Sequence, residues 1–290
     1  MALAFTGSIP LAPAVLIDVL FIPALVFTFG REVVAGGNKR NLVVVAAVGF
    51  FGLANILFCL NAIGVFDNEY WSRVGLGVAT VLIALIGGRI IPAFTRNWLA
   101  ARGHKVQIPD MGVIDKIALV MTVLSVVLWV VLPDEPITAF MLVLAGIGLA
   151  ARLTQWRGLK TIREPLLGGL HLAYIFLALS LILIGSSILQ PGLVPFSSGL
   201  HLLTAGTIGL MTFVVMTRAA LGHTNQPLTA SPLIATALAL VAGGAILRAT
   251  APWVSDFYMP LMYASAITWS LGFLLFAGTF GPAAFQQHAD

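Results

Sequence analysis

Long runs of apolar residues, separated by short polar segments, make up most of this chain. The segments 41–66 and 165–217 contain no Asp, Glu, Lys or Arg, and a membrane-spanning helix needs about 20 apolar residues. The runs also lack the polar face, repeated about every 3.6 residues, that a helix of a soluble core carries. Since open strand edges would leave backbone groups unpaired in lipid, we expect the spans to be helices.

Counting these runs predicts an all-α fold, a polytopic transmembrane helical bundle of about nine spans that forms one domain over residues 1–290. The fourth and fifth spans are short, and the sequence PDEP at 133–136 joins them in a tight turn. The expected spans lie near residues 9–29, 42–64, 74–94, 116–132, 136–154, 166–188, 199–218, 231–249 and 259–280.

The composition agrees with a membrane protein surrounded by a lipid bilayer. Apolar residues make up 59% of the chain and charged residues 9%, whereas soluble domains carry about 25% charged residues. The isoelectric point near 9.6 does not indicate a nucleic-acid partner, because basic loops on one side of the membrane explain it. The single cysteine, Cys59, excludes an intrachain disulfide.

The distribution of Lys and Arg predicts the orientation of the spans. Twelve of these cations follow odd-numbered spans, only Arg73 and Arg248 follow even-numbered spans, and Arg89 lies inside the third span. Cytoplasmic loops carry the excess of Lys and Arg, so we expect the N-terminus outside the cytoplasm and the C-terminus inside it. The twelve cations are Arg31, Lys39, Arg40, Arg96, Arg102, Lys105, Lys116, Arg152, Arg157, Lys160, Arg163 and Arg218.

Four ionisable residues at membrane depth are candidate functional residues, because an idle charge is unfavourable there. Asp18 is expected to face the bundle, either with a function or as a buried ion pair or protonated hydrogen bonder. Arg89 either extends to the inner interface or clamps an anion with its planar guanidinium. For His171 and His201, the alternative to metal ligation is a hydrogen bond between helices.

The histidines are expected at different depths. His171 lies about 8 Å inside the inner face by the helical rise, with Tyr174 one turn away, whereas His201 lies near the outer face. Across a core of about 30 Å these two would be about 20 Å apart, so we do not expect them to share one haem iron. His223 lies at the inner interface, where it follows Gly222 and helps to end the helix.

Motifs of soluble enzymes are absent from the sequence. None of GxxxxGKS/T, HExxH, GxSxG and CxxC occurs. The eleven carboxylates lie mostly in separate loops, which does not favour an oxygen-ligated magnesium or calcium site. If the protein binds a metal, its imidazole and thioether groups favour haem iron or copper.

Five segments together resemble the NnrS family of bacterial inner-membrane proteins, in their order and spacing as well as in sequence. They cover essentially the whole chain. The segments are LIDVLFIPAL (16–25), GREVVAGGNKRNL (30–42), LIGGRIIPAFTRNWLA (85–100), WRGLKTIREPLLGGLHLAY (156–174) and HLLTAGTIGLMTFVVMTRAALGHTNQPL (201–228).

The resemblance implies a multi-pass protein of the bacterial inner membrane that contains haem, expected as haem b, and copper. It also implies a role in nitric oxide and nitrosative-stress responses and in denitrification. Family members resemble twelve-span proteins, so the chain resembles a shortened version that lacks the first three spans. Loss of three spans from a chain that starts inside would place the N-terminus outside, as the cation count also predicts.

Several positions carry over from the family as candidates for cofactor binding. His201 or His171 would be the metal ligand, and Arg89 or Arg218 would pair with haem propionates. Cys59 stands where the family often has histidine, and an outer histidine pair is missing with the first spans, which weakens the expectation of copper. The cofactor-binding candidates are His171, His201, His223, Arg89, Arg96 and Arg218, and the further buried polar residues are Asp18, Tyr174 and Cys59.

Three functions remain open at this stage. The first is a haem- and copper-binding protein of the nitric oxide response, and the sequence does not decide whether it is an enzyme. The second is a transporter or permease for a small substrate, which the buried polar residues would suit. The third is a non-catalytic membrane subunit that works as a homo-oligomer or needs a partner with the missing spans.

Overall fold

The fold is known from a computed structural model that describes residues 10–37, 42–65, 70–104, 107–109 and 111–286. Nearly all of these residues are helical, and no strand occurs among them. Nine helical stretches in the described part of the chain are long and apolar enough to cross a membrane, which confirms the predicted bundle. The sides on which the two termini lie stay a prediction.

The chain divides into two compact units, residues 1–82 and 83–290, and the boundary falls inside the long helix α4 (Tyr70–Ala100). The first unit contains α2 (Leu11–Ala35), α3 (Leu42–Ala62) and the beginning of α4. A Cβ atom at Gly52 of α3 would lie 2.7 Å from Ile22 of α2, so the missing side chain lets these helices pack closely. That residues 1–290 form one domain stays a prediction.

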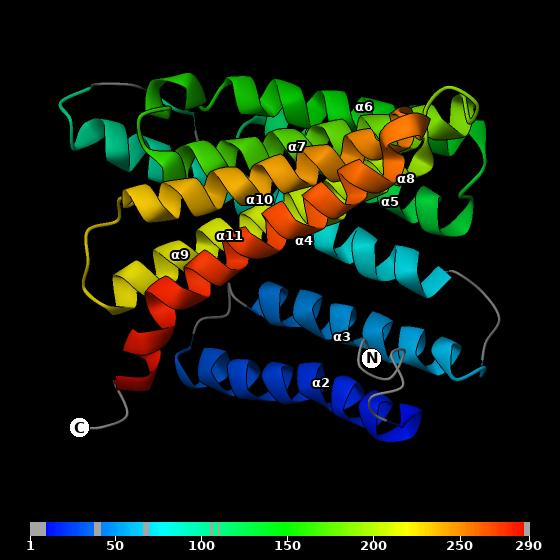
Figure 1. Ribbon diagram of the computed structural model, residues 1–290, viewed down its shortest axis with the longest axis horizontal. Coiled ribbons are helices and arrows are strands. Elements are labelled where there is room, and N and C mark those ends of the chain that lie inside the picture. Colours follow the sequence, from blue (N-terminus) through cyan, green and yellow to red (C-terminus); the bar gives the residue numbers. More distant parts are fainter. Residues whose placement is uncertain (1–9, 38–41, 66–69, 105–106, 110, 287–290) are drawn as a thin grey trace. The chain divides into compact units, whose positions relative to one another are not determined.

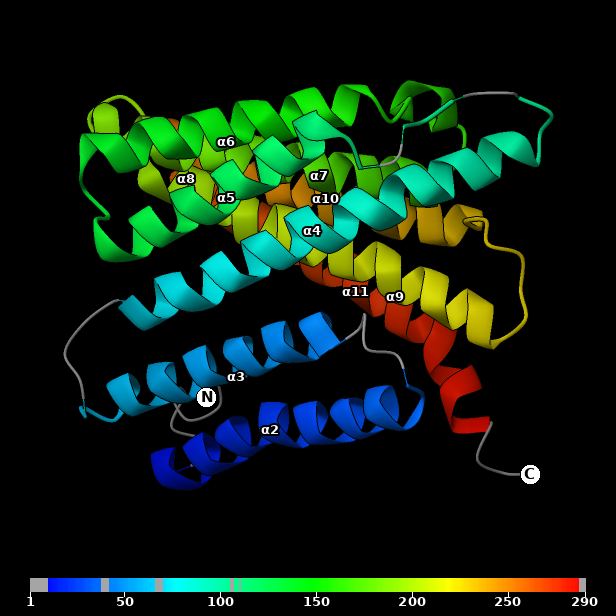
Figure 2. The same cartoon turned by 180° about the vertical axis from the view of Figure 1, so that it is seen from behind.

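The second unit begins with the rest of α4 and continues through an antiparallel series of helices (Figures 1 and 2). The fourth and fifth spans meet at the expected short turn. The elements are α5 (Val113–Val131), α6 (Pro136–Thr154), the short 3-10 helix η2 (Gly158–Thr161) and α7 (Pro165–Leu189).

The seventh span is one helical run with an interruption in its hydrogen-bond pattern. It consists of α8 (Phe196–His201), the π-helix η3 (Leu202–Ile208) and α9 (Gly209–His223). The remaining elements are α10 (Pro232–Thr250), the 3-10 turns η4 (Ala251–Trp253) and η5 (Ser255–Phe257), and α11 (Tyr258–Gln286).

Helix α7 forms the centre of the second unit, because it contacts α6 as well as α8, η3 and α9. Two glycines allow the approach to α6: a Cβ at Gly146 would lie 2.6 Å from the Ala178 carbonyl oxygen, and one at Gly185 would lie 2.6 Å from that of Ala139. Backbones that approach this closely gain dispersion contacts, which drive helix association in lipid. The second half of α7 is therefore packed directly against the backbone of α6.

Candidate functional site

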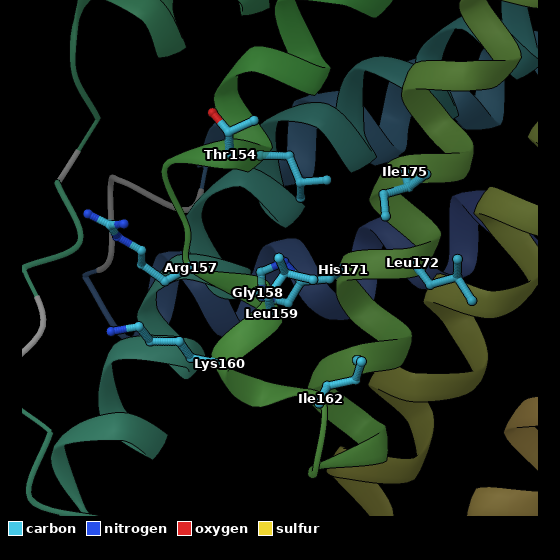
Figure 3. A pocket seen from close by; sticks show the side chains of 11 residues that line it. Thr154, Arg157, Gly158, Leu159, Lys160, Ile162, His171, Leu172 and Ile175 are labelled. Atoms are coloured by element: carbon cyan, nitrogen blue, oxygen red, sulfur yellow. The ribbon is translucent and has the colours of Figure 1, made fainter.

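A pocket of about 550 Å³ lies where α6 ends, η2 follows and α7 begins (Figure 3). Small-molecule sites commonly have volumes of about 300–1,000 Å³ and mainly apolar walls. This pocket has two cationic side chains, Arg157 and Lys160, and one imidazole, His171. Its large apolar side chains are Leu153, Leu159, Ile162, Leu172 and Ile175.

His171 combines burial with an incomplete set of hydrogen bonds. Its side chain belongs to α7 and is 6% exposed. The Nε2 atom lies 3.0 Å from Oγ1 of Thr95 on α4, so one nitrogen joins two helices by a hydrogen bond. The other nitrogen, Nδ1, is buried and has no hydrogen-bond partner among the described residues. A buried polar atom without a partner is unfavourable unless a ligand completes it.

The backbone of Gly158 in η2 packs against the unpartnered nitrogen of His171, and no side chain stands between them. A Cβ atom at position 158 would lie 2.7 Å from Nδ1, closer than real Cβ contacts permit. The preceding residue, Arg157, has a φ of +56°, and this left-handed conformation turns the chain from the end of α6 into η2. The local backbone thus brings a residue without a side chain to the ring of His171 (Figure 3).

Beside the pocket, Arg152 forms a fully buried cluster inside the membrane span α6. Its side chain has no exposed surface, and its Nε donates to Oδ1 of Asp115 on α5 at 2.5 Å. Its Nη1 donates to the hydroxyl oxygen of Tyr174 at 2.8 Å and to the carbonyl oxygen of Ala84 at 2.8 Å, and its Nη2 donates to that of Gly88 at 3.3 Å. The guanidinium therefore ties α6 to α4, α5 and α7.

Trp156 connects the Arg152 cluster to His171. Its buried indole lies 5.3 Å from the Arg152 guanidinium, which is within range of a cation–π interaction. Its ring centroid lies 4.7 Å from that of Tyr174 and 6.3 Å from that of His171. Aromatic rings at such distances attract one another. Trp156 also stands immediately before the turn that carries Gly158, so the cluster fixes the inner wall of the site.

The cationic candidates from the sequence lie away from this pocket. Arg89 has an exposed side chain on α4, and His223 is exposed on the last turn of α9. Arg96 is half-buried and donates to the carbonyl oxygen of Ile108 at 3.5 Å. Arg218 of α9 is half-buried, with its guanidinium 4.1 Å from the ring centroid of Phe94. None of these four side chains lines the pocket.

His201 lies at the point where α8 passes into the π-helix η3, and its side chain is half-buried. It does not line the pocket that His171 lines. A π-helix leaves backbone groups without their usual partners and often marks a functional position. Here the indole of Trp269 donates from Nε1 to the Ala205 carbonyl oxygen at 3.2 Å. The predicted separation of His171 and His201 along the membrane normal stays a prediction.

Asp18 and Cys59 meet inside the first unit. Cys59 is fully buried on α3, and its Sγ donates to Oδ2 of Asp18 on α2 at 3.3 Å. The amide nitrogen of Asn55 donates to the same oxygen at 3.2 Å. Asp18 thus accepts hydrogen bonds from a neighbouring helix, and the choice between a functional and a structural role stays open.

The sequence pattern did not reveal several residues of the site. Arg152 was counted among the loop cations because it lies at the end of its span, but the structure places it inside α6 with no exposed surface. Thr95 and Trp156 carry no charge and follow no motif, so nothing marked them. Asp115 offered one usable signal: a carboxylate in the first turn of a membrane span requires a partner.

The site offers one unpartnered imidazole nitrogen as a ligand beside an apolar pocket. No group of three or more His, Cys, Asp or Glu side chains that could hold a metal ion occurs among the described residues. A haem needs only one axial nitrogen from the protein, an apolar slot and cations for its carboxylates. The unpartnered Nδ1 of His171, the apolar walls of the pocket and the cation Arg157 correspond to these three features.

Comparison with known proteins gives one match. The family model described as "NnrS protein" matches residues 1–287 of the chain. No curated protein and no solved structure matches the chain.

Proposed function

Because the chain belongs to the NnrS family, we propose that it is a haem-binding protein of the bacterial inner membrane that acts in the nitric oxide and nitrosative-stress response. The nitric oxide role and the haem come from the family resemblance. One observation carries the assignment to a site: a buried imidazole nitrogen without a partner, beside a pocket of about 550 Å³. We assign His171 as the axial ligand on that basis.

The residues of the pocket have distinct roles in this proposal. Thr95 shares a hydrogen bond with Nε2 of His171, and this bond fixes the orientation of the ring. When Nε2–H donates to the Thr95 hydroxyl oxygen, Nδ1 keeps its lone pair for a metal. Gly158 packs against that nitrogen without a side chain, so only backbone of the short helix η2 has to move when a ligand reaches it. Arg157 pairs with a carboxylate through two parallel hydrogen bonds. When bound, the haem would supply an iron that binds nitric oxide.

Copper stays a prediction of the family resemblance alone. Copper held by the protein would need several nitrogen or sulfur ligands within bonding distance. The described residues contain no group of three His, Cys, Asp or Glu side chains that could hold a metal ion.

The test is to purify the protein in detergent from haem-replete cells and to measure its visible spectrum and its haem content per chain. We expect a Soret band in the wild-type protein and its loss in His171→Ala. His201→Ala and His223→Ala are matched controls, because they remove an imidazole elsewhere in the same unit, and both should keep the haem. Full haem content in His171→Ala, or its loss in His201→Ala instead, would overturn the assignment.

A colourless wild-type preparation would favour the second function, a transporter or permease. The π-helix η3 is the observation that supports this alternative, because it interrupts a span at membrane depth. Discontinuous spans often form the substrate sites of transporters. In that case uptake of a small substrate by intact cells should depend on the residues around η3 rather than on His171.

A further inference from the structure

The turn between α6 and α7 has three chemically different faces. From Arg157 to Glu164, basic residues recur every three positions, and so do large apolar residues. Three residues is the period of a 3-10 helix, and the 3-10 helix η2 occupies the middle of this segment. Gly158, Thr161 and Glu164 form the face toward the protein: Gly158 packs on His171, and the other two are buried.

The second face is apolar and almost fully exposed. Leu159 is 88% exposed and Ile162 is 73% exposed. Both side chains stand on a turn between two spans, where the chain passes through the boundary between lipid tails and headgroups. Large apolar side chains that are exposed to water at this boundary are stabilised when they enter the lipid tails.

The third face is cationic. Arg157, Lys160 and Arg163 are exposed and stand three residues apart. The segment 155–163 contains no Asp or Glu, and the carboxylate that follows, Glu164, is buried and accepts from the backbone N–H groups of Leu166 and Ala230. These cations belong to the side of the membrane that the charge distribution predicts to be cytoplasmic. Anionic phospholipids give that leaflet a negative surface potential, which attracts clustered Lys and Arg by about 1 kcal/mol for each cation.

We infer that the segment Arg157–Arg163 binds an anionic phospholipid of the inner leaflet. Its phosphate group contacts Lys160 and Arg163, while its acyl chain packs on Leu159 and Ile162. Lys160, Leu159 and Ile162 also line the pocket of His171 (Figure 3), so the lipid lies at the mouth of that pocket. The lipid site itself does not depend on the proposed haem, because it requires only the exposed faces of the turn.

Native mass spectrometry of the detergent-purified protein, titrated with phosphatidylglycerol or with phosphatidylcholine, tests this inference. We expect phosphatidylglycerol to bind at least tenfold more tightly than phosphatidylcholine. In Lys160→Gln/Arg163→Gln the affinity for phosphatidylglycerol should fall roughly 20- to 30-fold, since two surface cations are lost. Arg102→Gln/Lys116→Gln is the matched control, because it removes two exposed cations from the same predicted side and should keep the preference.

A second variant separates the lipid from a free anion. Leu159→Ser/Ile162→Ser keeps the cations and should weaken phosphatidylglycerol binding about tenfold, the effect of losing part of two buried apolar side chains. Displacement of phosphatidylglycerol by millimolar inorganic phosphate, equal losses in both charge variants, or no preference for the anionic lipid would each overturn the inference. Haem content is measured in parallel, so a failed lipid site and a failed haem site give different results.

Discussion

At the scale of single residues, two glycines determine how closely polar groups approach one another at the site. A side chain at position 158 would lie against Nδ1 of His171, and one at position 88 would occupy the space of the Arg152 guanidinium. Both positions have a neighbouring glycine where a methyl group would fit: Gly168 has no atom within 4 Å of an added Cβ, and Gly87 has only ordinary contacts. These neighbours provide matched controls.

Gly158→Ala should weaken haem binding while the protein stays folded. The added methyl group would lie 2.7 Å from Nδ1 of His171, so it would occupy the position from which a ligand approaches. We expect the haem affinity to fall at least about tenfold, the size of effect that changes around a metal ligand produce. Gly168→Ala, in the wall of the same pocket, should keep the affinity within twofold. Equal haem titrations for the two variants would contradict the role given to Gly158.

Gly88→Ala should destabilise the protein by displacing the Arg152 guanidinium from its carbonyl and carboxylate partners. Breaking a buried ion pair costs about 3–5 kcal/mol, because a charge is left unpaired away from water. Thermal unfolding followed by circular dichroism should show a clearly lower midpoint for Gly88→Ala than for Gly87→Ala. If both variants melt with the wild type, the cluster around Arg152 does not hold α4 to α6.

Residues of the site differ in how far the sequence could predict them. His171 was a candidate from the sequence alone, since an ionisable side chain in a long uncharged segment needs either a function or a hydrogen-bond partner. The burial of Arg152 was not predictable, because cations that face the cytoplasm also stand at the ends of spans. Only its ion pair with Asp115 on another helix distinguishes a buried arginine from an exposed one at this position. Thr95, which contacts His171, and Trp156, which contacts Arg152, are identified by contacts that a single sequence does not contain.

At the scale of elements, the π-helix in the seventh span depends on a side chain from another helix. A π-helix shifts the backbone hydrogen bonds by one residue and leaves a carbonyl oxygen without its usual donor. The indole of Trp269 on α11 supplies a donor to Ala205. Gly209 of α9 gives that indole room, and Gly244 of α10 lets the backbone of Trp269 approach closely. The interruption beside His201 is therefore a built feature of this span.

Trp269→Phe should destabilise the seventh span. It keeps most of the aromatic packing but removes the donor to Ala205, and a hydrogen bond of this kind contributes about 0.5–1.5 kcal/mol. Circular dichroism melting should show a lower midpoint for this variant. Trp253→Phe, which changes an exposed indole in η4, should melt like the wild type, and the same behaviour of Trp269→Phe would show that η3 does not need the hydrogen bond.

The sequence predicted the number of helices better than their ends. The expected third span, 74–94, is part of α4 (Tyr70–Ala100), and the expected seventh, 199–218, is part of a run from Phe196 to His223. Apolar composition marks only the part of a helix that lies in lipid, whereas these helices continue into polar segments. The three-faced turn at η2 is too short for such a pattern to detect.

At the scale of the whole molecule, hydropathy and charge predict different properties. The apolar runs predict nine spans, and the described helices confirm this number. The excess of cations after odd-numbered spans predicts an orientation, with the turn at η2 on the cytoplasmic side and the turn between α5 and α6 outside. The lipid site inferred above requires this orientation, because anionic lipid on the cytoplasmic side is its ligand.

Single cysteines in a Cys59→Ala background test the orientation. Asp134→Cys, in the exposed turn between α5 and α6, should react in intact cells with a maleimide that does not cross the membrane. Lys160→Cys, equally exposed, should react only after the membrane is permeabilised, since positively charged loops stay in the cytoplasm. The reverse pattern of labelling would place the turn at η2 outside and would contradict the cation count.

The central claim is that the imidazole of His171 holds a haem, and chemical rescue of His171→Gly tests it most directly. We predict that the purified variant has lost its Soret band, and that haem with added imidazole restores the band, because free imidazole fills the space that the side chain leaves. Imidazole should not change the spectrum of the wild-type protein. A His171→Gly protein that binds haem as the wild type does, with no response to imidazole, would contradict the claim.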